Sequence, residues 1–179
     1  MSRIGRKEIT VPQSVKVVIS DKVVISNGKQ SLEVAIPEKI NVNMSDNIIV
    51  VTRESEDKKT KSLHGLTRNL IANAVGGFGK AFERVLNIKG IGFKANVSGR
   101  KLILNVGYSH PVEFEIPEHI DIKVDAKGVE LIVFGVDKMQ VGEMAAEIRD
   151  VRPPEPYKGT GIMYAGERIV RKAGKSAGK

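Results

Sequence analysis

The chain has 179 residues, of which 41% are hydrophobic, and it contains neither Trp nor Cys. This length allows one domain or two small ones, and the lack of cysteine excludes disulfides, thiolate metal sites and a cysteine nucleophile. The longest apolar run, LIVFGV, is far shorter than the roughly 18 residues that span a bilayer, and the basic N-terminus lacks the apolar stretch of a signal peptide. We therefore expect a soluble, cytoplasmic protein.

The net charge of +8 is concentrated at the two ends of the chain. Residues 1–7 hold three basic residues and no acidic one, and residues 149–179 hold eight basic and three acidic residues. Residues 8–148 contain 18 basic and 18 acidic residues and are therefore neutral. A neutral body with two basic ends indicates a polyanionic partner.

The first half of the chain shows strand patterns. VKVVI (15–19), KVVIS (22–26) and LEVAI (32–36) have the alternation of half-buried strands, with turns between them. Pro37 ends the third of these strands because proline cannot donate to a β-ladder. NIIVVT (47–52) predicts a further strand.

A helix is expected next. Apolar residues at 63, 66, 70, 71, 74 and 75 follow helical spacing and predict a helix over 61–75, which the glycines of GGFG (76–79) should end. The charged run ESEDKKTK (54–61) before it is interpreted as a solvated loop, and His64 as a residue on the helix surface.

The second half repeats the first. LEVAIPEKINV (32–42) aligns with VEFEIPEHIDI (112–122), and Pro37 and Pro117 lie 80 positions apart. DKVVISNG (21–28) aligns with RKLILNVG (100–107), and Leu63, Leu66 and Leu70 align with Val141, Met144 and Ile148 at a separation of 78. Self-similarity at a near-constant offset is typical of an internal duplication.

ELIVFG (130–135) then predicts a strand and QVGEMAAEIRDV (140–151) a second helix, which the prolines at 153 and 154 should end. We predict an α+β fold of two tandem domains, each with an antiparallel or mixed β-sheet packed on one α-helix. The expected boundaries are 1–81, 82–152 and a basic C-terminal extension over 153–179.

No catalytic constellation is apparent. His64, His110 and His119 are isolated, with no metal-binding spacing, and His110 and His119 are expected at strand edges or in turns. GGFGKA lacks the Ser or Thr and the first glycine of a phosphate-binding loop, and KGIGFKA (89–95) is interpreted as a turn or bulge. We expect no metal, no cofactor, no small-molecule substrate and no enzyme activity.

The C-terminal extension contains the pattern that points to function. Its prolines fix backbone dihedrals and predict that residues 152–156 are extended, so that the chain leaves the domain after the second helix as a stiff strut. Gly159 and Gly161 remove side chains where the backbone lies close to something else. Tyr157 and Tyr164 are candidates to stack on unpaired bases, and the cations of the extension to pair with phosphates. RNA is favoured over DNA because no groove-reading helix carries the charge.

RPPEPYKGTGIMYAGERIVRKAGK (152–175) resembles the C-terminal signature of the sixth protein family of the large ribosomal subunit, bacterial type, and MSRIGRKEITVP (1–12) is similar to the start of that family. The resemblance covers essentially the whole chain and implies a non-catalytic rRNA-binding protein of two duplicated domains. It also implies contact with large-subunit rRNA near the sarcin–ricin loop and the base of the factor-recruiting stalk, beside neighbouring ribosomal proteins. Thr160 and Met163 stand where the family usually has a basic residue.

The candidate rRNA-binding residues lie at the two ends of the chain: Arg3, Arg6, Lys7, Arg149, Arg152, Tyr157, Lys158, Gly159, Gly161, Tyr164, Arg168, Arg171, Lys172 and Lys175. One alternative is a free-standing basic module for other polyanions such as acidic lipid, although no amphipathic basic helix is apparent. Another is an enzyme with an unrecognised site.

Overall fold

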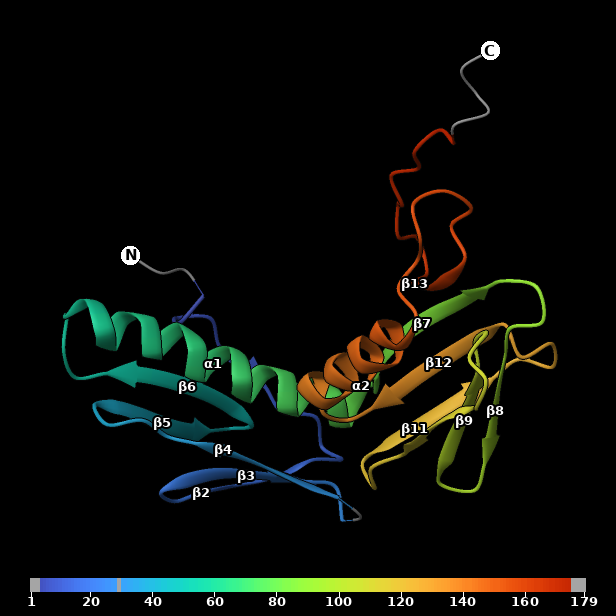
Figure 1. Cartoon of the computed structure of the whole chain (residues 1–179). Helices are drawn as coiled ribbons and strands as arrows, with labels where there is room; N and C mark the ends of the chain where they lie inside the picture. Colours follow the sequence, from blue (N-terminus) through green and yellow to red (C-terminus); the bar gives the residue numbers. More distant parts are fainter. Residues whose placement is uncertain (1–3, 29, 175–179) are drawn as a thin grey trace. The chain divides into compact units, whose positions relative to one another are not determined.

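The structure is a computed structural model that describes residues 4–28 and 30–174. Its residues separate into two compact units, one of Met1–Ala81 with Val136–Lys138 and one of Phe82–Gly135 with Met139–Lys179. Every strand pairing in the described part of the chain is antiparallel. The predicted α+β class is confirmed (Figure 1).

The first unit has two three-stranded sheets and a helix. One sheet has the order β2-β3-β4, formed by Lys16–Ile19, Lys22–Ser26 and Ser31–Ala35. The other has the order β1-β6-β5, formed by Ile9–Thr10, Ile48–Arg53 and Ile40–Ser45. Helix α1, Lys58–Gly79, packs on strands of both sheets, so that a single apolar core fills the space between them.

The second unit has the same parts and one more strand. Strands β10-β9-β8 are Val112–Glu115, Lys101–Asn105 and Lys94–Ser98. Strands β11-β12-β7-β13 are Ile120–Val124, Glu130–Gly135, Phe82–Lys89 and Gly161–Tyr164. Helix α2, Lys138–Val151, contributes Val141, Met144, Ala145 and Ile148 to the core of these sheets.

The duplication is visible in local geometry as well as in strand order. Gly28 and Gly107 follow equivalent strands and have φ values of 84° and 83°, in the left-handed region that favours glycine. The IPE sequences form the same turn twice, because Ile40 N–H donates to the Pro37 carbonyl at 3.2 Å and Ile120 N–H to the Pro117 carbonyl at 3.1 Å. Strand β13 has no counterpart among the described residues of the first unit.

The limits predicted for the first helix were wrong at both ends. Helix α1 begins at Lys58, because the Asp57 carboxylate caps it by accepting the Thr60 N–H at 2.6 Å, so part of the expected charged loop is helical. It continues through GGFG to Gly79. A glycine costs a helix about 1 kcal/mol relative to alanine, but Phe78 is buried in the core, and this packing keeps the last turn helical.

The buried face of α1 also differs from the prediction. Leu66 and Leu70 are 53% and 42% exposed, whereas His64 and Thr67 are buried. The buried positions of the helix are 60, 64, 67, 71, 74, 75, 77 and 78, which include 71, 74 and 75 of the predicted stripe but not 66 and 70. Ile71, Val75 and Phe78 lie on one side of the helix, and burying them turns the leucines outward.

His64 is therefore a buried residue and not the surface residue that the sequence predicted. Its Nε2 lies 2.8 Å from the Val51 carbonyl oxygen, and its Nδ1 lies 3.0 Å from Nη1 of Arg53. Because a guanidinium can only donate, Nδ1 accepts and Nε2–H donates. The imidazole is fully hydrogen-bonded, which makes its burial tolerable. His110 and His119 lie in turns, as expected.

Candidate nucleic-acid interface

Residues 152–174, called here the C-terminal segment, fold back on themselves. Ile162 N–H donates to the Arg152 carbonyl at 2.7 Å, and Glu155 N–H donates to the Thr160 carbonyl at 3.0 Å. Lys172 N–H returns to the Pro156 carbonyl at 2.9 Å, so the end of the segment runs beside its beginning. The expectation that the chain leaves the domain as a strut after residues 152–156 was wrong, because the backbone groups of these residues pair with residues 160, 162 and 172 and the chain returns to the unit.

Strand β13 attaches this segment to the second unit. It pairs with β7 from Gly161 opposite Lys89 to Tyr164 opposite Leu86, and Ile162 is fully buried. Gly161 has φ +141°, and a Cβ there would lie 2.7 Å from the carbonyl oxygens of Arg152 and Pro153. Glycine is required because the chain packs against its own backbone. GIMY is too short for its alternation to have predicted a strand.

A carboxylate shapes the turn at the tip of the segment. Glu155 accepts hydrogen bonds from the backbone N–H groups of Tyr157 and Lys158 and from the Thr160 hydroxyl. Desolvation acts to raise the pKa of Glu155, but the hydrogen bonds, led by that of Lys158, outweigh it and hold the pKa below its ordinary value of 4.5. The charged form of Glu155 thus stabilises the turn that presents Tyr157 and Lys158.

A second carboxylate fixes the return of the segment onto the unit. The Glu167 carboxylate accepts hydrogen bonds from Nε and Nη2 of Arg149, at 3.1 and 2.6 Å, and from the Tyr164 N–H at 2.9 Å. These bonds, Arg149 first, hold the pKa of Glu167 below its ordinary value. The Arg149 guanidinium also lies 5.8 Å from the centre of the Tyr164 ring. Two candidate RNA-binding side chains, Arg149 and Tyr164, are therefore engaged within the protein.

Arg152 is engaged in a similar way. Its guanidinium lies 5.2 Å from the centre of the Tyr108 ring, a cation–π contact. The Tyr108 hydroxyl in turn donates to the Val151 carbonyl at 2.8 Å. Arg152 and Tyr108 therefore join the start of the C-terminal segment to the turn that follows β9.

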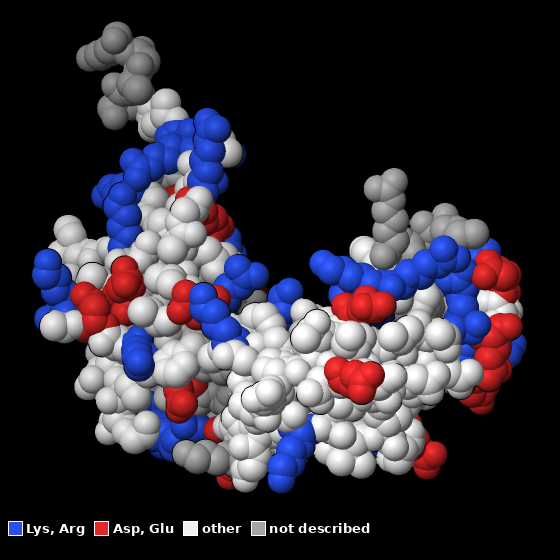
Figure 2. All heavy atoms as spheres, turned by 180° about the vertical axis from the view of Figure 1, so that it is seen from behind, with Lys and Arg blue, Asp and Glu red and all other residues white. Residues whose placement is uncertain are grey.

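The other cations of the segment face outward. Within residues 4–28 and 30–174, no carboxylate forms an ion pair with Lys158, Arg168, Arg171 or Lys172, and all four residues are exposed. Arg171 Nη2 lies 3.2 Å from the place of a Cβ at Gly159, so Gly159 makes room for this guanidinium. Tyr157 is 57% exposed. Figure 2 shows lysine and arginine gathered over the projecting end of the segment.

The N-terminal candidates lie on the first unit. Arg68 of α1 donates from Nε and Nη2 to the carbonyls of Lys7 and Glu8 at 2.9 and 3.2 Å. Gly5 packs on the His64 ring, since a Cβ there would lie 2.5 Å from it. These contacts hold the arm on the helix and leave Arg6 and Lys7 exposed. Arg3 and Lys175 lie outside the described residues.

The charge count by chain ends missed a basic stretch in the second unit. Residues 84–112 contain Arg84, Lys89, Lys94, Arg100 and Lys101 but no Asp or Glu. Arg100 and Lys101 pair with Asp121 and Glu113, at 2.9 and 3.3 Å. No ion pair involves Lys89 or Lys94 within the part of the chain that the structure describes. A search for long segments without acidic residues would have found this stretch.

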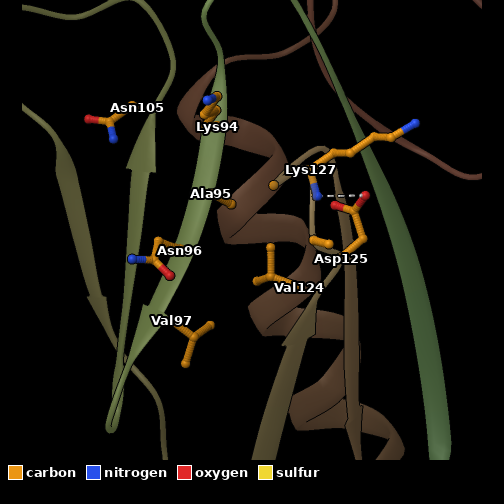
Figure 3. Close-up of a pocket in the computed structure, with 10 residues that line it drawn as sticks. Lys94, Ala95, Asn96, Val97, Asn105, Val124, Asp125 and Lys127 are labelled. Carbon is orange, nitrogen blue, oxygen red and sulfur yellow. Dashed lines mark hydrogen bonds between the residues drawn. The ribbon is translucent and has the colours of Figure 1, made fainter.

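A polar hollow lies beside Lys94 (Figure 3). Asn96 and Asn105 line it from β8 and β9, and the turn of residues 125–128 lines it from the other side. Asp125 holds this turn by accepting the N–H groups of Val129 and Glu130 at 2.7 and 3.0 Å. The Asp125 carboxylate is therefore already hydrogen-bonded to backbone N–H groups. The side chains that the hollow offers to a ligand are hydrogen-bonding groups such as the amides of Asn96 and Asn105.

The described residues contain no other kind of candidate site. No cluster of three or more His, Cys, Asp or Glu residues that could hold a metal ion occurs in residues 4–28 and 30–174. Within the same residues, neither helix is both long and apolar enough to cross a membrane. The fold and this surface define a two-unit α+β protein whose unpaired cations gather on an ordered C-terminal segment.

Comparison with known proteins assigns the family. The family model described as ribosomal protein L6 matches residues 11–81 and 89–165. The chain is 51% identical over 180 residues to the large ribosomal subunit protein uL6 of Caldicellulosiruptor saccharolyticus, covering 100% of this chain and 98% of the relative. It is 49% and 48% identical to the uL6 proteins of Thermodesulfovibrio yellowstonii and Bdellovibrio bacteriovorus, over 100% of both chains in each case.

The chain belongs to the ribosomal protein L6 family, a family of structural, non-enzymatic proteins. The resemblance seen at the C-terminal signature is confirmed. The two matched segments correspond to the two duplicated halves, which supports the interpretation of the repeat.

Proposed function

We propose that this protein is a structural component of the cytoplasmic large ribosomal subunit, where its C-terminal segment binds large-subunit rRNA. The observation that carries the proposal is the set of four exposed cations without ion-pair partners, Lys158, Arg168, Arg171 and Lys172, on a segment with fixed hydrogen bonds. A pre-ordered segment loses less conformational entropy on binding than a flexible tail. Affinity then comes mainly from phosphate contacts with counterion release, and specificity from RNA shape.

The candidate residues take different parts in this proposal. The four cations contact phosphates, and Tyr157 stacks on a base or ribose. Arg149, Arg152, Tyr164, Gly159 and Gly161 position the segment. The exposed Arg6 and Lys7 provide a separate phosphate contact from the first unit.

The placement within the subunit is a finer proposal. The C-terminal signature resembles that of a family located near the sarcin–ricin loop and the stalk base, beside the elongation-factor site. We therefore place the segment on that rRNA, with neighbouring large-subunit proteins as further partners and no membrane or small-molecule substrate.

The test is the salt dependence of binding to large-subunit rRNA. Lys158→Ala with Arg171→Ala should lower the slope of log affinity against log salt by about 0.7 to 0.9 for each lost phosphate contact. The same slope corresponds to a loss of about fivefold to eightfold per contact near 0.1 M salt. An unchanged slope and affinity would exclude these residues as phosphate contacts, and equal binding to anionic vesicles would favour a general polyanion module.

Point substitutions are preferable to truncation in this test. A chain that ends at Val151 would lose β13 and the buried Ile162, and would uncover the edge of β7. Reduced binding by such a chain could come from unfolding of the second unit. Lys158 and Arg171 are exposed, so their replacement leaves the sheet intact.

A further inference from the structure

The loop between β7 and β8 has an apex with an unusual side chain. Ile91 is 103% exposed, the highest value among the exposed large hydrophobic residues of the described chain. It lies in KGIGFK, between Lys89 and Lys94. A single exposed apolar residue needs no explanation in itself. The position of Ile91 does need an explanation, because it lies between Lys89 and Lys94, which form no ion pair in the described part of the chain, and because the stretch around it has no acidic residue.

The shape of this loop is fixed by its neighbours. Phe93 N–H donates to the Gly90 carbonyl at 3.4 Å, and Gly92 has φ +75°. A Cβ at Gly90 or Gly107 would lie 2.5 or 2.8 Å from the Phe93 ring, so this ring packs against both glycines. Phe93 also packs against the core of the second unit. The loop is therefore anchored by Phe93, and Ile91 is held in solvent.

The loop adjoins the C-terminal segment. Lys89, at the end of β7, pairs with Gly161 of β13. Phe93 touches Gly107, and the next residue, Tyr108, carries the Arg152 guanidinium over its ring. The loop is therefore joined to the C-terminal segment by two independent sets of contacts.

We infer that residues 89–94 form a second RNA-contact element, in which Ile91 packs against a base or ribose face and Lys89 and Lys94 contact the flanking phosphates. This inference rests on the proposed function, because it places the same RNA against the adjoining surface. Apolar side chains can wedge between base steps in a minor groove, and RNA offers a wide, shallow minor groove for such contacts. The amides of Asn96 and Asn105, in the hollow beside Lys94, can hydrogen-bond a ribose 2′-hydroxyl (Figure 3).

RNA fits this element better than a protein partner does. Residues 84–112 contain no carboxylate, and although Arg100 and Lys101 pair with Asp121 and Glu113, no ion pair involves Lys89 or Lys94 in the described part of the chain, which suits contact with a phosphate backbone. A protein-binding surface usually has fewer charges at its centre and a larger apolar area. Here the exposed apolar surface of the loop consists of one side chain between two lysines.

Affinity measurements with large-subunit rRNA separate the two kinds of contact. Ile91→Ser should weaken binding about threefold to tenfold, the effect of losing partial burial of one aliphatic side chain, with an unchanged salt slope. Lys89→Ala with Lys94→Ala should lower the slope by about 1.4 to 1.8, the effect of two phosphate contacts. Val18→Ser, at a residue of β2 that is 61% exposed, is the matched control and should bind normally.

The outcomes distinguish this inference from the proposed function. If Lys158→Ala with Arg171→Ala weakens binding while the loop variants bind like the natural chain, the loop inference is wrong and the proposed function stands. If all of these variants bind normally, both are wrong. Normal thermal unfolding of Ile91→Ser is expected, because its side chain has no packing to lose.

The absence of cysteine allows a direct test in assembled large subunits. Ile91→Cys introduces a unique thiol, to which a photoreactive cross-linker can be attached. We expect cross-links to rRNA, and Val18→Cys reports the background. Cross-links from position 91 to a protein instead of RNA would overturn the inference.

Discussion

At Gly161 the backbone leaves no room for a side chain, whereas at Gly142 of α2 a Cβ would have no atom within 4 Å apart from neighbours in its own helix. The same substitution should therefore have opposite effects. Gly161→Ala must displace the carbonyls of Arg152 and Pro153, and should destabilise the protein by about 1 to 3 kcal/mol. Gly142→Ala should stabilise it by about 0.5 to 1 kcal/mol, because alanine favours the helix. Chemical denaturation of the full chain measures both.

Gly166→Ala is a control that separates backbone strain from steric clash. Gly166 has φ +79° but no atom within 4 Å of its Cβ position, so alanine meets backbone strain without a clash. Its cost should lie below that of Gly161→Ala. Equal stability of the Gly161→Ala variant and the natural chain would show that the segment does not pack against its own backbone.

At the scale of elements, the C-terminal segment depends on two charged carboxylates, Glu155 and Glu167. The pKa of each is below the ordinary value of 4.5 in the folded chain. Their stabilising contribution is therefore fully present above 4.5 and is lost as the pH falls through the lower folded-state values. We expect the amides of Tyr157, Lys158 and Tyr164 to lose hydrogen-exchange protection over that acidic range, which a pH series of exchange measurements would detect.

Substitution separates this local effect from general acid unfolding. Glu155→Gln and Glu167→Gln should reduce protection of the segment at neutral pH, because a neutral amide oxygen is a weaker acceptor than a carboxylate. Glu147→Gln, at an exposed position of α2, is the control and should leave the segment unchanged. Full protection in the Glu155 and Glu167 variants would contradict the role given to these carboxylates.

At the scale of the whole molecule, the position of charge matters more than its sum. Residues 113–148 hold nine acidic residues and only Lys123, Lys127 and Lys138 as basic ones, so this stretch offsets the basic stretch before it. The neutral total of residues 8–148 conceals that separation. A polyanion responds to the local field, which is screened beyond about 10 Å at 0.1 M salt.

We therefore expect two variants of equal net charge to bind RNA differently. Lys22→Ala with Lys61→Ala removes two cations of the first unit that are paired with Glu33 and Glu56. It should leave the salt slope for large-subunit rRNA nearly unchanged. Lys158→Ala with Arg171→Ala has the same net charge and should lower the slope. Equal slopes would mean that net charge alone governs binding.

The sequence by itself determined the duplication, the α+β class, the second helix and five strands, β2, β3, β4, β6 and β12, but it did not predict the longest strand, β7. These features depend on local patterns: alternation in strands such as 22–26, the repeated IPE turn, and proline after α2. The C-terminal signature likewise determined the family, because it is a contiguous string of residues. Local physical chemistry is sufficient where neighbours in sequence decide the conformation.

Tertiary structure alone decided which face of α1 is buried, where that helix ends, and how the C-terminal segment is held. Leucine at 66 and 70 satisfies helical spacing as well as His64 and Thr67 do, but Phe78 and Ile71 have a place in the core and fix the rotation of the helix. Strand β13 forms because its backbone pairs with the free edge of β7, where Gly161 lies opposite Lys89, 72 residues earlier in the chain. Arg149 is paired with Glu167, and the guanidinium of Arg152 lies over the Tyr108 ring; no local pattern contains either pairing. Each of these outcomes depends on partners distant in sequence, and only the folded chain brings them together.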